Sequence, residues 1–398
     1  MSRRSDAAHY DVVVIGAGAA GMMCAAEAGK RGRRVLLVEH TDKPGQKIRI
    51  SGGGRCNFTN TGVSAAAFLS ANPHFAISAL KRFTPADFIA RVDAAGIAWH
   101  EKTLGQLFCD GSAQQIIDML LRALSDAGVV LVTGTSVNAV EKTETGFALA
   151  LSSGPVTCAS LVIATGGKSI PKMGATGFAY EVARSFGVLV VETRPALVPL
   201  TFDASLLERT QELSGVSVAG RVRHGKTAFE EAVLFTHRGL SGPAILQISS
   251  YWREGDAIVV DMAPGVDVFA ALRTARQKAG KQAVRTALAE ILPRRLAQAL
   301  AAWLEVEVPL GSLSDARLRA VGEAVNAWAV RPVGSEGYRT AEVTLGGVDT
   351  AALDARTMGV KALPGLYFIG EAADVTGWLG GYNFQWAWSS GWAAGQAV

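Results

Sequence analysis

The sequence predicts an α/β protein whose main domain is split by an insertion, and three observations carry this prediction. A buried-strand pattern runs into a glycine-rich turn over residues 12–21, and a second buried-strand pattern returns near the C-terminus at 366–371. Between them, the chain changes from short strand patterns with turn signals to an Ala-, Leu- and Arg-rich stretch at helical spacing. We therefore expect the first part of the main domain at 1–190, a β-rich insertion at 191–265, a small helical subdomain at 266–330, and the return strand with the last part of the main domain at 331–398.

The first element is Val12–Ile15, a continuous apolar run typical of a parallel strand buried on both faces. A G-x-G-x-x-G turn follows, in which Gly16 permits the tight turn, Gly18 lets a phosphate approach the backbone, and Gly21 lets the next helix pack on the strand. The free N–H groups and the dipole at the start of this helix, expected over 18–30, favour an anion. The expected phosphate contacts are Gly16, Gly18, Ala19, Ala20 and Gly21.

The second strand pattern, Val35–Val38, ends at Glu39. A carboxylate at this position accepts hydrogen bonds from both hydroxyls of a ribose and repels a 2′-phosphate. Strand, glycine turn, helix, strand and acidic residue in this order predict a Rossmann-type fold that binds an adenine dinucleotide, FAD or NAD but not NADP. We expect Glu39 and the adjacent His40 at the ribose.

The elements that follow complete the first part. Residues 45–60 are dense in Gly and polar donors and predict neither a regular helix nor a central strand. Ser112 and Gln115 form a capping box for a helix with one apolar face. Three β-like runs then predict an antiparallel meander that leads into a strand ending at Ala164–Gly167. These runs are Val129–Val132, Ser136–Val140 and Phe147–Leu151.

Composition and charge narrow the class of protein that the chain belongs to. The chain has 398 residues and is 49% hydrophobic, enough for two or three cored domains. Its net charge is +4, and the chain has no long Lys/Arg block that would indicate nucleic-acid binding. The start lacks an apolar leader core and no apolar run reaches about 18 residues, so we expect a cytoplasmic protein that spans no membrane. Four widely spaced cysteines and scattered histidines predict no disulfide framework, no metal site and no redox dithiol.

Four motifs in order resemble the BaiN/YhiN-like flavoproteins, also called aminoacetone-oxidase-like FAD-binding enzymes. The motifs are Gly16–Gly21 with Glu39, Gly45–Asn60, Ala164–Gly167 and Gly370–Asn383. The resemblance covers nearly the whole chain and implies noncovalent FAD in a split Rossmann-type domain with a β-barrel-like insertion and a helical subdomain. This sequence departs from the family at Phe108-Cys109-Asp110 and at Met358-Gly359-Val360-Lys361, which indicates a divergent subgroup.

The resemblance also implies which residues hold FAD. The first motif holds the ADP half, residues 45–60 run beside the pyrophosphate and the flavin ring, and Asp374 lies near the ribityl and pyrophosphate groups. A helix start at 380–383 meets the flavin N1/O2 edge, where its dipole stabilises anionic reduced flavin. The candidate contacts beyond the first motif are Gln46, Lys47, Ser51, Gly53, Gly54, Arg55, Cys56, Asn57, Ala164, Thr165, Gly166, Gly370, Glu371, Asp374, Gly380, Gly381, Tyr382 and Asn383.

Three residues are candidates for catalysis. His237 is a candidate acid or base and Arg238 a candidate carboxylate ligand on the substrate side, and the alternative is a polar turn before a helix capped by Ser241. Cys56 is a candidate reactive thiol whose pKa Arg55 would lower, or else a small packing residue. Lys47 and Arg55 either clamp phosphate or are solvated loop charges. Aromatic residues at 378–388 either line the flavin or belong to the core.

The sequence thus predicts an FAD-dependent oxidoreductase that exchanges a hydride between flavin N5 and a small organic substrate. Since there is one dinucleotide fingerprint, NAD(P)H would visit only transiently, and O₂ is another partner for the flavin. An ene-type reductase and an amine oxidase both remain open. A second class is a tRNA-modifying or nucleic-acid-associated flavoprotein with basic helices at 271–296, although a solvated helix face, which we favour, explains the same charges. A third is a flavin-bound scaffold without turnover.

Overall fold

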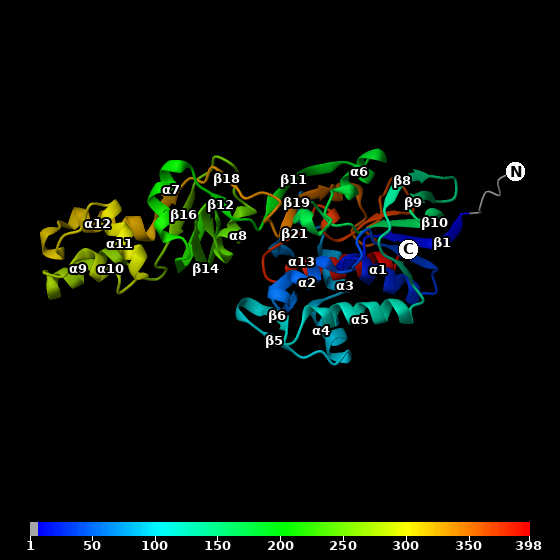
Figure 1. Cartoon of the computed structure of the whole chain (residues 1–398), viewed down its shortest axis with the longest axis horizontal. Helices are drawn as coiled ribbons and strands as arrows, with labels where there is room; N and C mark the ends of the chain where they lie inside the picture. Colours follow the sequence, from blue (N-terminus) through cyan, green and yellow to red (C-terminus); the bar gives the residue numbers. More distant parts are fainter. Residues whose placement is uncertain (1–6) are drawn as a thin grey trace. The chain divides into compact units, whose positions relative to one another are not determined.

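The computed structural model describes residues 7–398. Residues 1–6, which belong to the N-terminal segment where we expect no apolar leader, lie outside the described range. The chain divides into a split unit, Met1–Arg194 with Val343–Val398, and an inserted unit, Pro195–Glu342 (Figure 1). The expected return at 331 is too early, because Trp328–Val330 and Gly334–Ser335 pair with strands of the inserted unit. In the described part of the chain, no helix is both long and apolar enough to cross a membrane.

A seven-stranded sheet forms the centre of the split unit. Its main path runs β7 (Val130–Val132), β2 (Val35–Val38), β1 (Ala8–Ile15), β10 (Gly154–Ile163), β9 (Phe147–Leu151) and β8 (Val137–Lys142), and β20 (Leu366–Phe368) also pairs with β10. β1 lies parallel between β2 and β10, and β20 is parallel to β10, so both parts of the split unit share one sheet. The prediction of a split Rossmann-type domain is therefore confirmed.

One strand pairing differs from the expected meander. β8, β9 and β10 are antiparallel neighbours, but β7 pairs in parallel with β2. The capped helix α5 (Ala113–Asp126) connects to β7, and its N-terminal Ser112 and Gln115 form the predicted capping box. Because a helix precedes β7, the chain can reach a parallel position on the sheet edge that a short hairpin connection does not allow.

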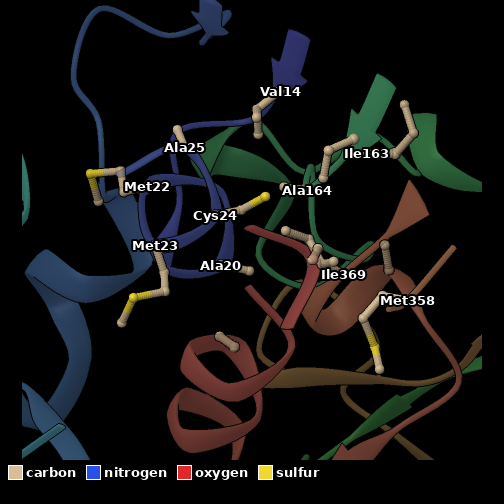
Figure 2. Close-up of a cluster of buried hydrophobic side chains, with 14 of the residues drawn as sticks. Val14, Ala20, Met22, Met23, Cys24, Ala25, Ile163, Ala164, Met358 and Ile369 are labelled. Atoms are coloured by element: carbon tan, nitrogen blue, oxygen red, sulfur yellow. The ribbon is translucent and has the colours of Figure 1, made fainter. Parts of the chain in front are cut away.

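Helices α1 (Ala19–Lys30) and α13 (Tyr382–Gly395) pack closely against each other. A Cβ at Gly391 would lie 2.5 Å from the carbonyl oxygen of Ala20, so this contact requires glycine. Ala20 and Cys24 of α1 lie in one buried cluster with Ala164 and Ile369 (Figure 2). The core of the split unit thus sits directly beneath the strand ends and the glycine turn.

The glycine-rich segment after β2 is partly helical. α2 spans Gln46–Gly54, but Ser51 has an extended ψ of 146° and Gly52 and Gly53 have φ of +58° and +66°. The expectation of no regular helix is therefore wrong for the first half of the segment and right for the second. β3 (Asn57–Asn60) follows as an edge strand of a three-stranded sheet in the order β3, β6 (Gln106–Cys109) and β5 (Trp99–Glu101), in agreement with the expectation of no central strand here.

The inserted unit contains a second seven-stranded sheet, which is antiparallel throughout. Its order is β17 (Trp328–Val330), β16 (Ile258–Asp261), β13 (Ser217–His224), β14 (Thr227–Thr236), β15 (Gly239–Ser241), β12 (Leu200–Thr201) and β18 (Gly334–Ser335). Among residues 7–398, β17 and β18 do not pair with each other, so the ladder of this barrel-like insertion stays open. The predicted helical stretch contains α9 (Val268–Ala279), α10 (Val284–Leu288), α11 (Arg294–Trp303) and α12 (Asp315–Asn326).

Short elements complete both units. In the split unit these are β4 (Phe68–Leu69), α3 (Ile77–Arg82), α4 (Pro85–Ala94), α6 (Phe178–Ser185), β11 (Val190–Ala196), β19 (Val343–Val348) and β21 (Thr376–Gly377). β11 pairs with β19 where the chain leaves and re-enters this unit. In the inserted unit they are α7 (Ala204–Thr210) and α8 (Pro243–Ser249).

Candidate cofactor site

The three glycines of the G-x-G-x-x-G turn have different surroundings. Gly16 has a φ of +102°, and a Cβ there would lie 2.6 Å from the Ala164 carbonyl oxygen. A Cβ at Gly21 would lie 1.9 Å from the Gly16 carbonyl oxygen. At Gly18, by contrast, a Cβ would meet nothing within 4 Å. Gly16 and Gly21 are thus required for packing, whereas Gly18 faces open space at the start of α1, where a phosphate can approach the backbone.

Glu39 is fixed beside this turn. Its Oε2 accepts from the Ala17 N–H at 2.9 Å, and its Oε1 accepts from the Thr41 N–H at 2.9 Å and from the Thr41 hydroxyl at 2.8 Å. His40 Nδ1 lies 3.1 Å from the same Oε1, and the His40 side chain is 46% exposed. A carboxylate has about four lone-pair sites and three of them accept the bonds above, so Glu39 keeps one site, on Oε2, for a ribose hydroxyl.

Three distant segments meet at the glycine turn. The Ala164 N–H donates to the Ile15 carbonyl at 2.8 Å, the Gly45 N–H donates to Ala17 at 2.9 Å, and the Ile369 N–H donates to Ile163 at 3.1 Å. These bonds bring the second, third and fourth sequence motifs to the carboxyl ends of β1, β10 and β20. In doubly wound sheets, ligands bind at this edge.

Thr165 carries a polar atom that the protein leaves unsatisfied. Its Oγ1 is buried and has no hydrogen-bond partner among the described residues. Such an atom costs about 1–3 kcal/mol when it stays unpaired. Its position directly after β10, next to Gly166 with a φ of +72°, fits a bound group that supplies the missing partner. Together with the open face of Gly18 and the carboxylate of Glu39, this atom shows that the residues fit an adenine dinucleotide.

A polar cluster joins Lys47, Ser169 and Glu371. Lys47 Nζ donates to Glu371 Oε2 at 2.6 Å and to the Ser169 hydroxyl at 2.6 Å. Glu371 Oε1 accepts from the Ser169 hydroxyl at 3.0 Å and from the Thr344 N–H at 2.9 Å. Burial alone would raise the pKa of Glu371, but the Lys47 charge and these hydrogen bonds hold the pKa below its usual value. Lys47 is therefore an ion-pair partner and not a solvated loop charge.

The start of α13 is held by side-chain amides. Asn383 Oδ1 accepts from the Gly377 N–H at 2.8 Å, and Asn383 Nδ2 donates to the Gly377 carbonyl at 2.9 Å. Asn60 Nδ2 donates to the Gly380 carbonyl at 2.8 Å. A Cβ at Gly381 would lie 2.4 Å from the Thr59 carbonyl oxygen, so glycine is required there. These contacts fix the helix start, and the predicted approach of its N–H groups to a flavin stays a prediction.

Three further candidates, Asp374, Trp386 and Trp388, are buried. Asp374 is 2% exposed, and its Oδ2 accepts from the Ala71 N–H at 2.8 Å. Burial raises the pKa of Asp374, and this outweighs the hydrogen bond from Ala71. Trp386 and Trp388 donate their indole N–H groups to the carbonyls of Gly370 and Phe58. Both indoles are almost fully buried, so these two aromatic residues belong to the core.

Cys56 differs from its predicted reactive form. Its side chain is fully buried, and burial raises the pKa of the thiol well above its ordinary value. A hydrogen bond with Ser51 lowers this pKa, but by less than burial raises it. The expected lowering of the pKa by Arg55 is therefore wrong, and Cys56 is a packing residue. Arg55 itself is exposed, and no side-chain partner joins it among the residues that the structure describes.

His237 and Arg238 belong to the inserted unit, whereas the motifs above belong to the split unit. They form the exposed turn between β14 and β15, where the Thr236 hydroxyl accepts from the N–H groups of Arg238 and Gly239. This is the geometry of a polar turn, and their catalytic roles stay predictions. Gly242, not Ser241, caps α8.

Sequence reasoning missed Ser169, Thr344 and the linking role of Asn60. Ser169 follows the predicted Ala164–Gly167 motif, and Asn60 lies inside the second motif, so both carried a positional signal. Thr344 carried none, because it contributes its backbone N–H to Glu371. Within residues 7–398 no group of three His, Cys, Asp or Glu side chains is arranged to hold a metal.

The chain belongs to the family described as HI0933-like protein Rossmann domain, whose pattern matches residues 10–397. It is 54% identical over 389 residues to a ribosomal RNA dihydrouridine synthase of Escherichia coli K12, which covers 97% of each chain. It is also 28% identical to a 3-dehydro-bile acid delta(4,6)-reductase of Clostridium scindens over 97% of this chain and 98% of that protein. The family confirms the resemblance drawn from the four motifs.

Among solved structures, the chain is similar to 3-ketosteroid-delta4-(5alpha)-dehydrogenase from Rhodococcus jostii RHA1. The TM-score is 0.50 at 14% identity, and the match covers 99% of this chain and 98% of that one. This likeness concerns the fold alone. The predicted fold class, α/β with a Rossmann-type FAD-binding domain, and the flavoprotein oxidoreductase family are thus confirmed.

Proposed function

We propose that this protein is an FAD-dependent reductase that converts a uridine of ribosomal RNA to dihydrouridine. The observation that carries the proposal is the 54% identity, over 97% of both chains, to a relative named for this reaction. The proposal takes up the nucleic-acid-associated flavoprotein that the sequence left as an alternative. It replaces the expected small organic substrate and the expectation of no nucleic-acid partner.

The residues that would hold FAD are those of the strand-end site. Gly18 and the start of α1 would face the pyrophosphate, Glu39 the ribose, and Thr165 Oγ1 would gain its missing partner. Bound FAD would supply two electrons as a hydride. The Lys47–Glu371 pair neutralises both charges at the strand ends, so that Glu371 is not an unpaired carboxylate at this site.

The chemistry of uracil sets the electron balance. Its C5–C6 double bond is conjugated with the C4 carbonyl, so C6 is the electrophilic carbon. Addition of a hydride at C6 and of a proton from water at C5 would give dihydrouridine. Bound reduced FAD would supply the two electrons of the hydride and would itself become oxidised. A reduced nicotinamide would resupply the electrons by a transient visit. The name of the bile acid relative also denotes reduction of carbon–carbon double bonds next to a carbonyl, which favours the ene-type reductase over the amine oxidase.

The helices of the inserted unit support an RNA partner. Between residues 271 and 304 the chain has seven basic residues and one acidic residue, Glu290. Arg276 contacts Asp315 and the Leu313 carbonyl, and Arg295 contacts the Glu212 carbonyl, so these two are engaged. Five others are exposed and have no ion-pair partner among the described residues, and we name them the basic helix cluster. They are Arg273, Lys278, Lys281, Arg285 and Arg294.

A concentrated positive charge binds phosphates even when the whole chain is nearly neutral, because Coulomb attraction is screened within about 10 Å at ordinary salt. The modest net charge of +4 is therefore compatible with RNA binding, because the basic residues are concentrated between residues 271 and 304. We propose that the basic helix cluster contacts the RNA backbone.

The proposal is tested with the purified flavoprotein under anaerobic conditions. After reduction with dithionite, ribosomal RNA from a strain that lacks this gene should restore the absorbance of oxidised flavin, with one dihydrouridine formed per flavin reoxidised. Oxidised protein should keep its absorbance with a panel of amines. Reduced flavin that ribosomal RNA leaves unchanged, or bleaching by an amine, would contradict the proposal.

A further inference from the structure

Leu104 is an exposed apolar residue in a strained conformation. It lies at the tip of the β5–β6 hairpin, and its side chain is 63% exposed. Its φ of +60° and ψ of +32° place it in the left-handed region, which is costly for a bulky side chain. Gly105, with a φ of +74°, follows in the same region, so two successive residues turn the chain left-handed.

The surrounding structure holds this conformation in place. Asn60 is 1% exposed, and its Nδ2 donates to the Leu104 carbonyl at 2.9 Å and to the Gly380 carbonyl at 2.8 Å. The Asn60 Oδ1 accepts from the Gly62 N–H at 2.8 Å, so both the nitrogen and the oxygen of this amide are engaged. One buried side chain therefore ties the hairpin tip to Gly380, two residues before α13.

A second contact makes the same connection. A Cβ at Gly380 would lie 2.9 Å from Cγ of Gln106, so the hairpin packs tightly on the α13 approach. The hairpin tip with Leu104 is thus held near the start of α13, which the sequence motifs predict to meet the edge of the flavin. Strain that the surrounding structure maintains is concentrated at ligand-binding positions in proteins.

The exposed side chain of Leu104 is open to contact with an apolar surface from outside the folded chain. In structured RNA a uracil is stacked and paired, so an enzyme that acts on its C5–C6 bond has to expose the base first. Proteins that open a base stack insert apolar side chains such as Leu next to a base, because every base has an apolar face.

We propose that Leu104 is a substrate-contacting residue that packs against a base adjacent to the reduced uridine and holds the target out of its stack. The inference rests on the proposed function. The left-handed backbone fixes the direction of the side chain, and Asn60 couples this direction to the start of α13.

The test compares two forms of one substrate. Ribosomal RNA from a strain that lacks this gene is used folded with Mg²⁺ and, separately, after nuclease digestion to short fragments. The variants are Leu104→Gly, which removes the wedge and relieves the backbone strain, and Leu104→Met, which keeps an apolar side chain of similar size. Leu189→Ala is the matched control, since Leu189 is an apolar residue of the same unit that is 72% exposed.

We expect Leu104→Gly to lower kcat/KM on folded RNA roughly tenfold, which is the usual worth of one stacking contact, and to change it less than about twofold on fragments. The same variant should raise Tm and retain its flavin absorbance, because a strained position is relieved and no core contact is lost. Leu104→Met and Leu189→Ala should stay within about threefold of wild type on both substrates.

Three results would overturn the inference: an unchanged rate of Leu104→Gly on folded RNA, an equal loss on both substrates, or loss of flavin from this variant. Wild-type protein that forms no dihydrouridine on either substrate would overturn the proposed function itself, and the inference with it.

Discussion

Lys47 and Glu371 form an ion pair of 2.6 Å although they are 324 residues apart in the sequence. Lys47 stands in the first turn of α2, and Glu371 follows β20, so the pair joins the two parts of the split unit at the edge of the sheet. Ser169, after β10, completes the cluster by contacting both partners. The strand-end site is therefore held together by charge as well as by backbone hydrogen bonds.

Loss of the Lys47 charge should destabilise this site. In Lys47→Met the largely buried Glu371 carboxylate loses its cation, and we expect a lower free energy of unfolding by about 1–2 kcal/mol, since the one-third exposure of Lys47 weakens the pair. Urea unfolding measures this difference. The double variant Lys47→Met/Glu371→Gln should recover part of the loss, whereas additive losses would show that the two side chains do not interact.

The pH dependence of stability follows from the direction of the Glu371 shift. Because the folded pKa is lowered, the carboxylate stabilises the fold above its unfolded pKa of about 4.3, and this stabilisation is lost as the pH falls through the folded value. The stability difference between wild type and Glu371→Gln should thus be constant above about pH 5 and shrink below about pH 4. Thermal unfolding at a series of pH values measures it. A difference that stays constant down to pH 3 would contradict the assignment.

The glycine turn offers a sharp pair of variants. Gly18→Val should fold and lose flavin, because its Cβ has open space but occupies the place of the pyrophosphate. Gly21→Ala should fail to fold, since a Cβ would lie 1.9 Å from a backbone oxygen. Visible flavin absorbance and circular dichroism separate these outcomes. Gly18→Val protein that keeps wild-type flavin content would show that the cofactor lies elsewhere.

Cys56 should be dispensable for chemistry. Burial raises the pKa of its thiol, so the thiol stays neutral near pH 7 and resists iodoacetamide in the folded protein. We expect Cys56→Ala to keep flavin and to turn over within about twofold of wild type, since a buried thiol removed from solvent contributes packing alone. Mass spectrometry locates any alkylated cysteine. Rapid alkylation of Cys56 together with loss of turnover would restore the reactive thiol.

The basic helix cluster should set the salt dependence of RNA binding. Lys278→Gln/Lys281→Gln is expected to lower affinity for ribosomal RNA and to reduce the slope of log K against log salt by about 1–2, as two phosphate contacts are lost. Filter binding at several salt concentrations measures the slope. The control Lys81→Gln/Arg184→Gln removes two exposed cations of the split unit and should leave it unchanged. Equal slopes for the two double variants would place RNA on another surface.

The local parts of the fold were predictable from the sequence. Val12–Ile15, the glycine turn and Val35–Val38 form β1, the start of α1 and β2, because apolar runs and glycine spacing encode them within about thirty residues. The capping box at Ser112 was predictable for the same reason. The partner of β7 was not, since pairing with β2 depends on where α5 returns the chain to the sheet.

In the candidate site too, the local motifs were predictable from the sequence and the contacts between distant residues were not. The four motifs indicated which segments converge, but not that Lys47 pairs with Glu371 or that the Thr344 N–H completes the pair. Such contacts join residues whose spacing in the sequence carries no pattern. The prediction of a reactive thiol at Cys56 was wrong. It considered the effect of the Arg55 charge on the thiol pKa but not the burial of Cys56, which raises this pKa and depends on tertiary packing.

The most direct measurement is the dihydrouridine content of ribosomal RNA by mass spectrometry. RNA from a strain that lacks this gene, incubated with the purified flavoprotein and NADPH or NADH, should gain about one dihydrouridine at one position and gain none with Gly18→Val protein. Ribosomal RNA whose dihydrouridine content is the same with and without the gene, and which stays unchanged on incubation, would contradict the central claim.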